Sequence, residues 1–351
     1  MPTFRPPASA ARAAGALGAA ALLTAVLTGC TSGAGGKASA GPAVEPLATS
    51  VPAGVTLRIA DQNDLLRTTL QASGQDKDLP YGISWSSFQG GPAVLEAFRA
   101  GAADVGFVSD APVVFAQAHG QDARVVGVVQ NSPDAVHLWT SPGSAAKTVA
   151  DLKGKKVAYA EGTTFQPAVL TALKNAGLKP TDVTLVKLNP PEIPAALAAG
   201  QVDAGTLTEP LVSKYGNAYQ DKGAHELDGD KGLTSGLQLL IAPGAAVTDP
   251  ARSAALADLA ARFTRAELWI TAHKDAWVQS YYVTSQKLPA SVGEAVVANN
   301  GTATIPDYAT ASARLQQIAD VLAAAGVITR QDVGTVFDRR FDAVQSAAAK
   351  G

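Results

Sequence analysis

The chain has 351 residues, of which 47% are hydrophobic and 17% are charged, so it is long enough for two compact lobes with their own cores. Its formal net charge of −2 argues against nucleic acid as a partner. The single cysteine excludes an intramolecular disulfide and a metal site with several cysteines, and we expect neither a metal nor a cofactor.

The amino terminus has the pattern of an export signal. Arg5 and Arg12 precede a small apolar stretch at 13–27, which ends in Leu27-Thr28-Gly29-Cys30. These four residues resemble the lipobox of bacterial lipoproteins, in which the cysteine thiol carries a diacylglyceryl group. A transmembrane helix is the alternative, but the stretch is short and rich in Ala and Gly. We therefore expect a signal peptide at 1–29, lipid attachment at Cys30, and a protein secreted across the cytoplasmic membrane and anchored on its outer side.

Residues 30–54 are rich in Ala, Gly, Ser, Thr and Pro, and we expect a flexible tether there. Strand and helix patterns alternate after it, beginning with the alternation of apolar and polar side chains at 55–59. The next segments predict a helix at 65–70, a strand at 83–85, a helix at 92–101, a strand at 105–108, a helix at 111–119 and a strand at 124–130. This β-α-β-α-β order predicts a parallel sheet with helices on its faces.

A second, smaller α/β unit begins after Trp139. Its pattern predicts strands at 155–160, 183–188 and 202–207, and helices at 164–176 and 194–199. An apolar strand is expected at 237–242, and the chain beyond it is mostly helical. Two apolar stripes in that part indicate core packing; they consist of Leu256, Leu259, Phe263, Ala266 and Ile270, and of Leu315, Ile318, Leu322 and Ala325.

Catalytic signatures are absent or incomplete in the sequence. Ser144 and Lys147 fit an SxxK pattern, but the SDN and KTG partners do not follow. No GxSxG or HExxH pattern occurs, and the four histidines are far apart in sequence. We therefore expect that the protein is not an enzyme.

Polar loops follow the predicted strands of both units. Ligands of open α/β sheets bind beyond the carboxyl ends of strands, where helix N-termini point their free N–H groups. Capping and turn formation would explain each loop by itself, but together the loops of two facing units predict a polar cleft. The candidate ligand-binding residues are Asp61, Gln62, Asn63, Phe88, Gln89, Gly90, Gly91, Ser109, Asp110, Thr163, Thr164, Phe165, Gln166, Asn189 and Glu209.

Several of these segments together resemble a known family. The segments are Phe88-Gln89-Gly90-Gly91-Pro92, Asp104-Val105-Gly106-Phe107, Ser109-Asp110-Ala111-Pro112, 149–158 (Val-Ala-Asp-Leu-Lys-Gly-Lys-Lys-Val-Ala), Ala176-Gly177-Leu178 and Gly200-Gln201-Val202-Asp203-Ala204. They are similar to the aliphatic-sulfonate, nitrate and taurine binding proteins of ABC importers, a family that also includes binders of thiamine-pyrimidine precursors. The resemblance covers most of residues 55–240.

The resemblance implies a two-lobed periplasmic-binding-protein-like fold of type II, hinged by two chain crossings near 137–140 and 235–239. Lobe 1 would comprise 55–139 and 237–351, and lobe 2 would comprise 140–236. Ligand contacts carried over from the family are Gln62, Ser109, Asp110, Thr163, Thr164 and Glu209. Where family members often have Trp-Asp-Pro, this chain has Thr208-Glu209-Pro210, which removes an aromatic side chain from the expected site.

The family further implies a monomer that captures a small polar molecule, sulfonate-like or pyrimidine-like, and presents it to an ABC permease and ATPase. Two alternatives stay open: a sensory lipoprotein without a transport role, and a pyrimidine-precursor enzyme on the same fold. The cleft loops contain Asp61, Asp110 and Glu209 and no Lys or Arg. Because further carboxylates would repel a dianion, we expect a neutral, zwitterionic or cationic ligand, with Glu209 as its charged partner.

Overall fold

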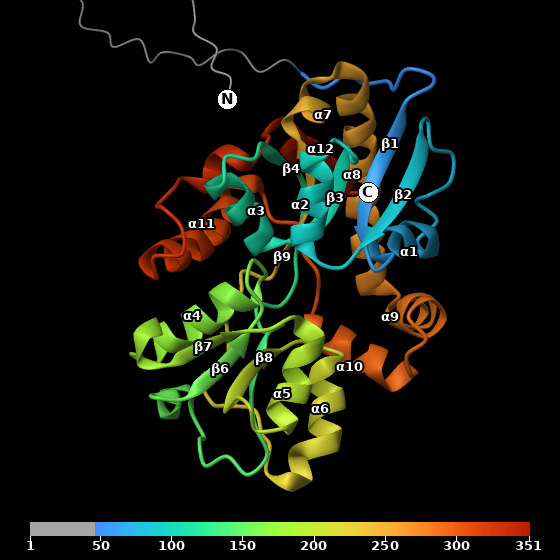
Figure 1. Cartoon of the computed structure of the whole chain (residues 1–351). Helices are drawn as coiled ribbons and strands as arrows, with labels where there is room; N and C mark the ends of the chain where they lie inside the picture. The colour runs from blue at the N-terminus through green and yellow to red at the C-terminus, as the bar shows by residue number, and fades with distance from the viewer. Residues whose placement is uncertain (1–45) are drawn as a thin grey trace, which may run out of the picture. The chain divides into compact units, whose positions relative to one another are not determined.

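The computed structural model describes residues 46–351, which belong to one compact unit. Figure 1 shows two lobes, each built around its own sheet. The expected signal peptide, Cys30 and most of the expected tether lie outside the described residues. Within 46–351, no helix combines the length and apolar character that a membrane span requires.

The first lobe is built on a five-stranded sheet in the order β2-β1-β3-β9-β4. Its strands are β1 (Thr56–Gln62), β2 (Gly82–Phe88), β3 (Val105–Ser109), β4 (Ala123–Gln130) and β9 (Leu237–Pro243). The strands β1, β2 and β3 are parallel, as the sequence predicts. The predicted strand β4 runs in the same direction, but it is separated from β3 by β9, which returns from the second lobe and inserts antiparallel between them.

Helices cover the sheet of the first lobe. They are α1 (Leu65–Ala72), α2 (Gly91–Arg99), α3 (Asp110–Ala118), α7 (Gly244–Thr248), α8 (Pro250–Ala272), α11 (Tyr308–Ala324) and α12 (Arg340–Ala348). Phe263 of α8 is fully buried and meets Phe107 of β3 edge to face at 5.4 Å. Burial of one such side chain contributes about 1.5–3 kcal/mol. The apolar stripe predicted on 256–270 therefore is core packing, with Ile270 half-buried at its end.

The outer edge of β4 is closed by a side chain. Gln345 of α12 accepts a hydrogen bond from the Val128 N–H and donates one to the Val128 carbonyl. Its amide also donates to the Thr264 hydroxyl of α8 at 2.8 Å. Because unpaired edge groups are open to other strands, this fully buried glutamine both ties α12 to the sheet and protects the edge.

The second lobe is built on a four-stranded sheet in the order β5-β8-β6-β7, in which β5 is antiparallel and the others are parallel. Figure 1 shows α4 on one side of this sheet and α5 with α6 on the other. The elements are β5 (His137–Thr140), β6 (Lys156–Tyr159), α4 (Phe165–Asn175), β7 (Thr184–Lys187), α5 (Ile193–Ala198), β8 (Ala204–Leu207) and α6 (Leu211–Tyr219).

Two crossings connect the sheets. One runs through 131–136, between β4 and β5, and the other through 231–236, before β9. Residues 137–140, expected near a crossing, form a strand of the second sheet, so the chain leaves the first sheet a few residues earlier than predicted. The crossings touch: the Asn131 N–H donates to the Gly236 carbonyl at 2.9 Å. Gly236 has φ +71°, and a Cβ there would collide with the Asn131 carbonyl, so glycine is required.

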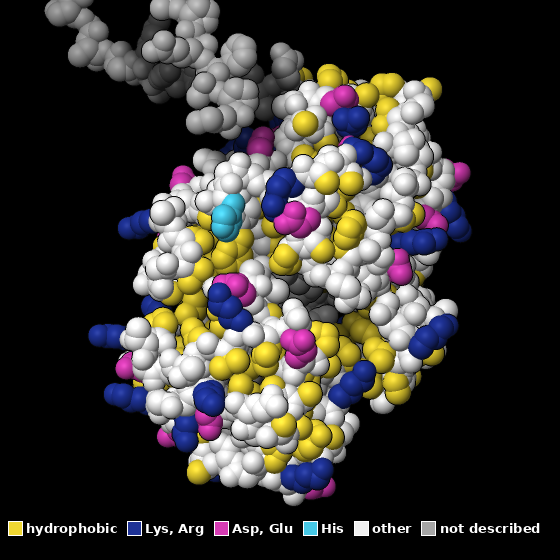
Figure 2. Space-filling view, viewed as in Figure 1, with side chains coloured by type: hydrophobic (Ala, Val, Ile, Leu, Met, Phe, Trp, Pro, Cys, Tyr) yellow, Lys and Arg dark blue, Asp and Glu magenta, His cyan; other side chains and the backbone are white. Residues whose placement is uncertain are grey.

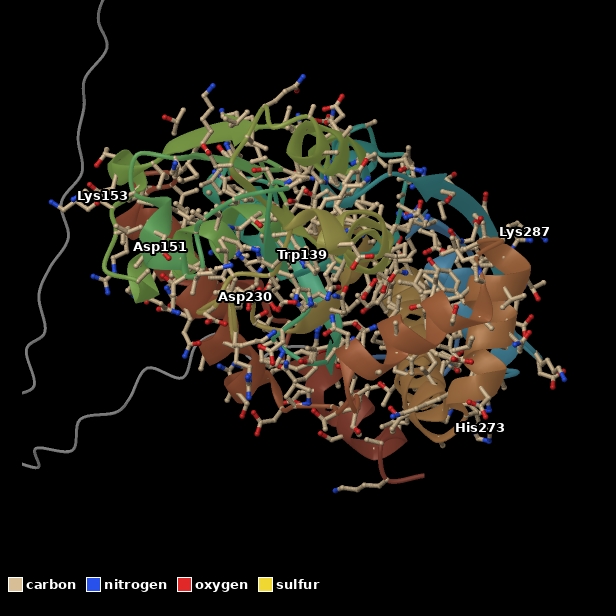
Figure 3. All side chains as sticks on the ribbon, turned by 90° about the horizontal axis from the view of Figure 1, so that it is seen from below. Trp139, Asp151, Lys153, Asp230, His273 and Lys287 are labelled. Carbon is tan, nitrogen blue, oxygen red and sulfur yellow. The ribbon has the colours of Figure 1, made fainter. Side chains whose placement is uncertain are left out.

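The C-terminal segment, residues 267–303, lies beside the crossings. After α8 come α9 (Lys274–Trp277), the π-helix η5 (Val278–Ser285) and α10 (Ala290–Asn300). The Asn300 carbonyl accepts from the Ser132 N–H of the first crossing, and the Asn299 amide lies 3.1 Å from His137 Nε2 of β5. Figure 3, a view from below, places His273 and Lys287 on this segment and Asp151 and Lys153 toward the other end of the molecule.

Candidate functional site

A cavity of about 1150 Å³ lies between the two lobes. Its wall is formed by loops of both sheets, by the two crossings and by the C-terminal segment 267–303. Figure 2 shows a recess near the centre of the molecule, between the upper and lower lobes. The volume is large enough for a small organic molecule.

The first lobe contributes the loops that follow β1, β2 and β3. Gln62 donates from Nε2 to the Phe107 carbonyl at 2.6 Å, which fixes the end of β1 to β3. Gln89 donates to the Asn63 side chain at 3.2 Å. Gly90 and Gly91 begin α2, so the first N–H groups of this helix lie at the cavity wall.

The second lobe contributes the loop at the N-terminus of α4. The Thr163 hydroxyl donates to the Ala160 carbonyl and accepts from the Phe165 N–H, which holds the loop in a tight turn. Thr164 points the other way, toward the first lobe. Asn189, after β7, completes this side of the wall and donates to Glu192.

Asp110 joins the two lobes and a crossing. Its Oδ1 accepts hydrogen bonds from the Ala111 N–H at 2.6 Å and from the Thr164 hydroxyl at 2.9 Å. Its Oδ2 accepts from the backbone and the hydroxyl of Ser235, in the second crossing. Ser109 and Thr164 are also hydrogen-bonded, at 2.7 Å. The carboxylate is 1% exposed, and its negative charge is satisfied by four donors from three parts of the chain.

Most of the residues expected at the cleft line the cavity. Those that do are Gln62, Asn63, Gln89, Gly90, Gly91, Ser109, Asp110, Thr163, Thr164, Phe165 and Asn189. Those outside the wall are Asp61, Phe88, Gln166 and Glu209. Phe88 packs against the hydrophobic core, and Gln166 accepts a hydrogen bond from the Gly162 N–H. Contact with a ligand stays a prediction for all of them.

Asp61 and Glu209 serve helix ends rather than the cavity. Asp61 is 1% exposed and accepts from the N–H groups of Leu66 and Arg67 at the start of α1. Burial raises its pKa, although these backbone hydrogen bonds oppose the shift. Glu209 accepts from the backbone and the hydroxyl of Ser213 in α6. These two carboxylates therefore do not support the expectation that the cavity repels a dianion. Two lysines, Lys187 and Lys274, also line the cavity, and they lie outside the loops from which the ligand charge was predicted.

The C-terminal segment adds an aromatic wall that the sequence analysis missed. Trp277 and Tyr281 stack with ring centroids 4.9 Å apart and planes within 1° of parallel. Tyr282 meets Tyr281 edge to face at 5.0 Å. All three rings line the cavity. Three aromatic residues within six positions of a helical segment were the sequence signal for this wall, and they supply aromatic surface in a protein that lacks it at 208–210.

Glu267 of α8 also faces the cavity, and the sequence analysis missed it too. It lies in the last part of the helix, one residue after the stripe position Ala266, and is 8% exposed. Within residues 46–351, its carboxyl group has no hydrogen-bond or ion-pair partner. Burial raises its pKa to about 8, so the carboxyl is mostly protonated at neutral pH.

A second titratable cluster lies beside the crossings. His137 Nδ1 is 3.0 Å from a Glu226 oxygen and 3.9 Å from an Asp230 oxygen, and Lys231 bonds to Glu226. The hydrogen bond from His137 lowers the pKa of Glu226 to about 2, whereas burial and the neighbouring Glu226 raise that of Asp230 to about 6. Figure 3 labels Asp230 and Trp139 of β5 in the second lobe.

The ligand atoms of His137, Glu226 and Asp230 lie within 4.8 Å of one another, close enough to suit a metal ion. The Lys231 ammonium already pairs with both carboxylates, at 2.7 Å and 3.5 Å. These residues therefore form a closed ion-pair network between a crossing and β5, and we do not assign a metal to it.

Comparisons with known proteins agree with this geometry. Residues 88–216 match the family model described as NMT1/THI5 like. Over 160 residues the chain is 41% identical to the putative aliphatic sulfonates-binding protein of Escherichia coli strain K12. The aligned part is 45% of this chain and 50% of that protein. The chain thus aligns with about half the length of this curated relative.

Solved structures extend the likeness over the whole fold. The alkanesulfonate-binding protein of Xanthomonas axonopodis pv. citri, solved bound to MOPS, is 28% identical with a TM-score of 0.71, covering 82% of this chain and 99% of that one. A desulfurization enzyme in complex with biphenyl-2-sulfinic acid is 16% identical with a TM-score of 0.59, covering 83% and 99%, and shares the fold alone. The chain therefore has the two-lobed fold of periplasmic binding proteins, and its residues 88–216 are similar to the NMT1/THI5-like family model.

Proposed function

We propose that this protein is the extracytoplasmic binding component of an ABC importer and that it captures a small polar ligand, of the sulfonate or taurine class, between its lobes. The observation that supports this most is the interlobe cavity, lined on both sides by helix N-termini, hydroxyls and amides. Relatives named as aliphatic-sulfonate-binding proteins support the ligand class. In this role the protein works with a permease and an ATPase.

The backbone N–H groups at two helix N-termini are suited to bind an anion in this cavity. The N-termini of α2 and α4 both line the cavity, and they offer free N–H groups from opposite lobes. The Thr163 and Thr164 hydroxyls lie beside the second of these helices. A sulfonate oxygen can therefore accept hydrogen bonds without a lysine or arginine at its side.

Binding without catalysis is part of the same proposal. The desulfurization enzyme shows that the fold also supports chemistry, so the cavity has to be considered by its own residues. The chain contains one cysteine, Cys30, outside the described residues, and the described cavity wall contains no histidine. The Thr164 hydroxyl donates to the Asp110 carboxylate at this wall, but three further donors already occupy that carboxylate, which suits a structural role.

Thermal-shift measurements with aliphatic sulfonates, amino acids and pyrimidines would test the proposal, followed by calorimetry on the ligands found. A ligand at a hundred times its Kd stabilises the folded protein by about 2.7 kcal/mol. We expect Gln89→Ala and Asn189→Ala, on opposite walls, to weaken sulfonate binding, whereas the exposed Gln201→Ala leaves it unchanged. Chemical turnover of a bound sulfonate, or no stabilisation by any sulfonate, would contradict the proposal.

A further inference from the structure

Glu267 is the unusual carboxyl group of the cavity wall. The other carboxylates there already have partners: Asp110 bonds to Thr164 and Ser235, Glu161 pairs with Lys187, and Glu192 accepts from Asn189. Within residues 46–351, Glu267 has none, although more than nine tenths of the residue is buried. A buried ionisable group without a partner is costly, so its presence at a cavity points to a partner that the ligand supplies.

The aromatic wall lies on the same side of the cavity. Trp277, Tyr281 and Tyr282 follow α8 directly, and Glu267, when it is ionised, raises the pKa of the Tyr282 hydroxyl. The face of an aromatic ring attracts a cation, and it does so most strongly where water is excluded. A buried carboxyl group that lines the same cavity as three aromatic rings is therefore suited to a positively charged group with apolar substituents.

We propose that Glu267, together with Trp277, Tyr281 and Tyr282, forms a subsite for a cationic group of the ligand, so that the protein selects a sulfonate that also carries an ammonium group. This inference rests on the proposed function, because it narrows the ligand class of the same cavity. The cation lies at the C-terminal segment, and the anion lies at the N-termini of α2 and α4.

Ligand binding is coupled to a proton in this arrangement. Burial holds the pKa of Glu267 at about 8, and an ammonium group beside it stabilises the ionised form, so a proton leaves as the ligand binds. The other charged and titratable groups of this region are Lys274 and Tyr281, which line the same cavity, and Tyr282, whose pKa is also raised by Glu209 of the second lobe. Neither Lys274 nor Tyr282 forms an ion pair or hydrogen bond with Glu267 in the described chain.

Calorimetry with probes that differ in charge would test the subsite. Taurine carries a sulfonate and an ammonium group, 2-hydroxyethanesulfonate carries the sulfonate alone, and ethanolamine carries the ammonium alone. We expect the wild-type protein to bind taurine at least about tenfold more tightly than 2-hydroxyethanesulfonate. Titrations in two buffers of different ionisation enthalpy should show proton release with taurine between pH 6 and 8. Glu267→Gln should remove both the preference and the proton release, and the exposed Glu294→Gln should keep both.

The outcomes separate this inference from the proposed function. Equal binding of both sulfonates, or a preference that persists in Glu267→Gln, overturns the cationic subsite and leaves sulfonate binding in place. Binding of ethanolamine alone, abolished in Glu267→Gln, supports the subsite and overturns the sulfonate class. If none of the probes binds to the folded wild-type protein at millimolar concentration, both are overturned. A thermal unfolding curve for each variant shows that the comparison is made on folded protein.

Discussion

Thr164 of the second lobe donates a hydrogen bond of 2.9 Å to the carboxylate of Asp110 in the first lobe. Asp110 in turn accepts from Ser235 of a crossing, so one carboxylate holds both lobes and the hinge between them. The two lobes are therefore in direct contact in this structure. The closed arrangement is stabilised by direct hydrogen bonds as well as by any ligand between the lobes.

We predict that Thr164→Val opens the ligand-free protein. The change removes a hydrogen bond to a charged group, worth about 1.5–3 kcal/mol, from the closed state only. Small-angle scattering should therefore give a larger radius of gyration for Thr164→Val than for the wild type. Thr163→Val is the matched control, because the Thr163 hydroxyl bonds only within its own lobe. An unchanged radius in Thr164→Val would show that this bond does not hold the lobes together.

Glu209→Ala should reduce stability more than ligand affinity. The Glu209 carboxylate caps the start of α6 through the Ser213 backbone and hydroxyl, and it lies outside the cavity wall. Loss of such a cap costs about 0.5–2 kcal/mol. Chemical denaturation should show this loss, and calorimetry should give a Kd within about a factor of two or three of the wild type. A tenfold weaker Kd at unchanged stability would return Glu209 to the ligand site.

The loops of the cavity were predictable because the order of elements determines where they lie. Alternating strands and helices place every βα loop at the carboxyl edge of its sheet, and Ser109 and Thr164 occupy that edge in their own lobes. Their direct contact was not predictable, because the angle between the lobes depends on tertiary packing. The antiparallel direction of β9 was not predictable either, because an apolar strand pattern does not tell in which direction a strand joins its sheet.

The roles of the carboxylates could not be separated by sequence. A polar residue after a strand gives the same sequence pattern whether its side chain caps a helix or contacts a ligand. Asp61 reaches the N–H groups of Leu66 and Arg67 because Asn63 and Asp64 both have positive φ, and this turn has no clear sequence signature. Glu267 lies four residues after Phe263, at the helical spacing of the apolar stripe. An acidic residue at the edge of such a stripe was the one sequence feature that could have indicated its buried position.

Stability should fall as the pH rises from about 6.5 to 8.5, and Glu267 should account for much of this. Its pKa is about 8 in the folded protein and near its ordinary value of 4.5 in the unfolded chain. Between these values the folded state holds a proton that the unfolded state has lost, so the free energy of unfolding decreases with pH, by at most about 1.4 kcal/mol per unit. The raised pKa of Asp230, about 6, acts in the same direction but mainly below this window.

Glu267→Gln is the variant that tests this dependence. Denaturation of the ligand-free protein at several pH values should give a flatter profile for Glu267→Gln than for the wild type. Glu294→Gln, an exposed glutamate on α10, should keep the wild-type slope. If the wild type and Glu267→Gln lose stability in parallel above pH 6.5, the carboxyl group of Glu267 ionises as freely in the folded protein as in the unfolded chain.

The last prediction concerns membrane attachment through Cys30, which lies outside the described residues. Cys30 follows a basic and apolar leader and ends the segment Leu27-Thr28-Gly29-Cys30. Each buried methylene of an acyl chain contributes about 0.8 kcal/mol, and two chains are sufficient for stable anchoring. Cys30→Ser should therefore move the protein from the membrane fraction to the soluble fraction, with unchanged ligand affinity in the released protein because the described cavity wall is built from residues between 62 and 303. Detergent phase partitioning of the parent and of Cys30→Ser would measure the change. Equal retention of both in the detergent phase would mean that the leader itself, rather than a lipid on Cys30, holds the protein at the membrane.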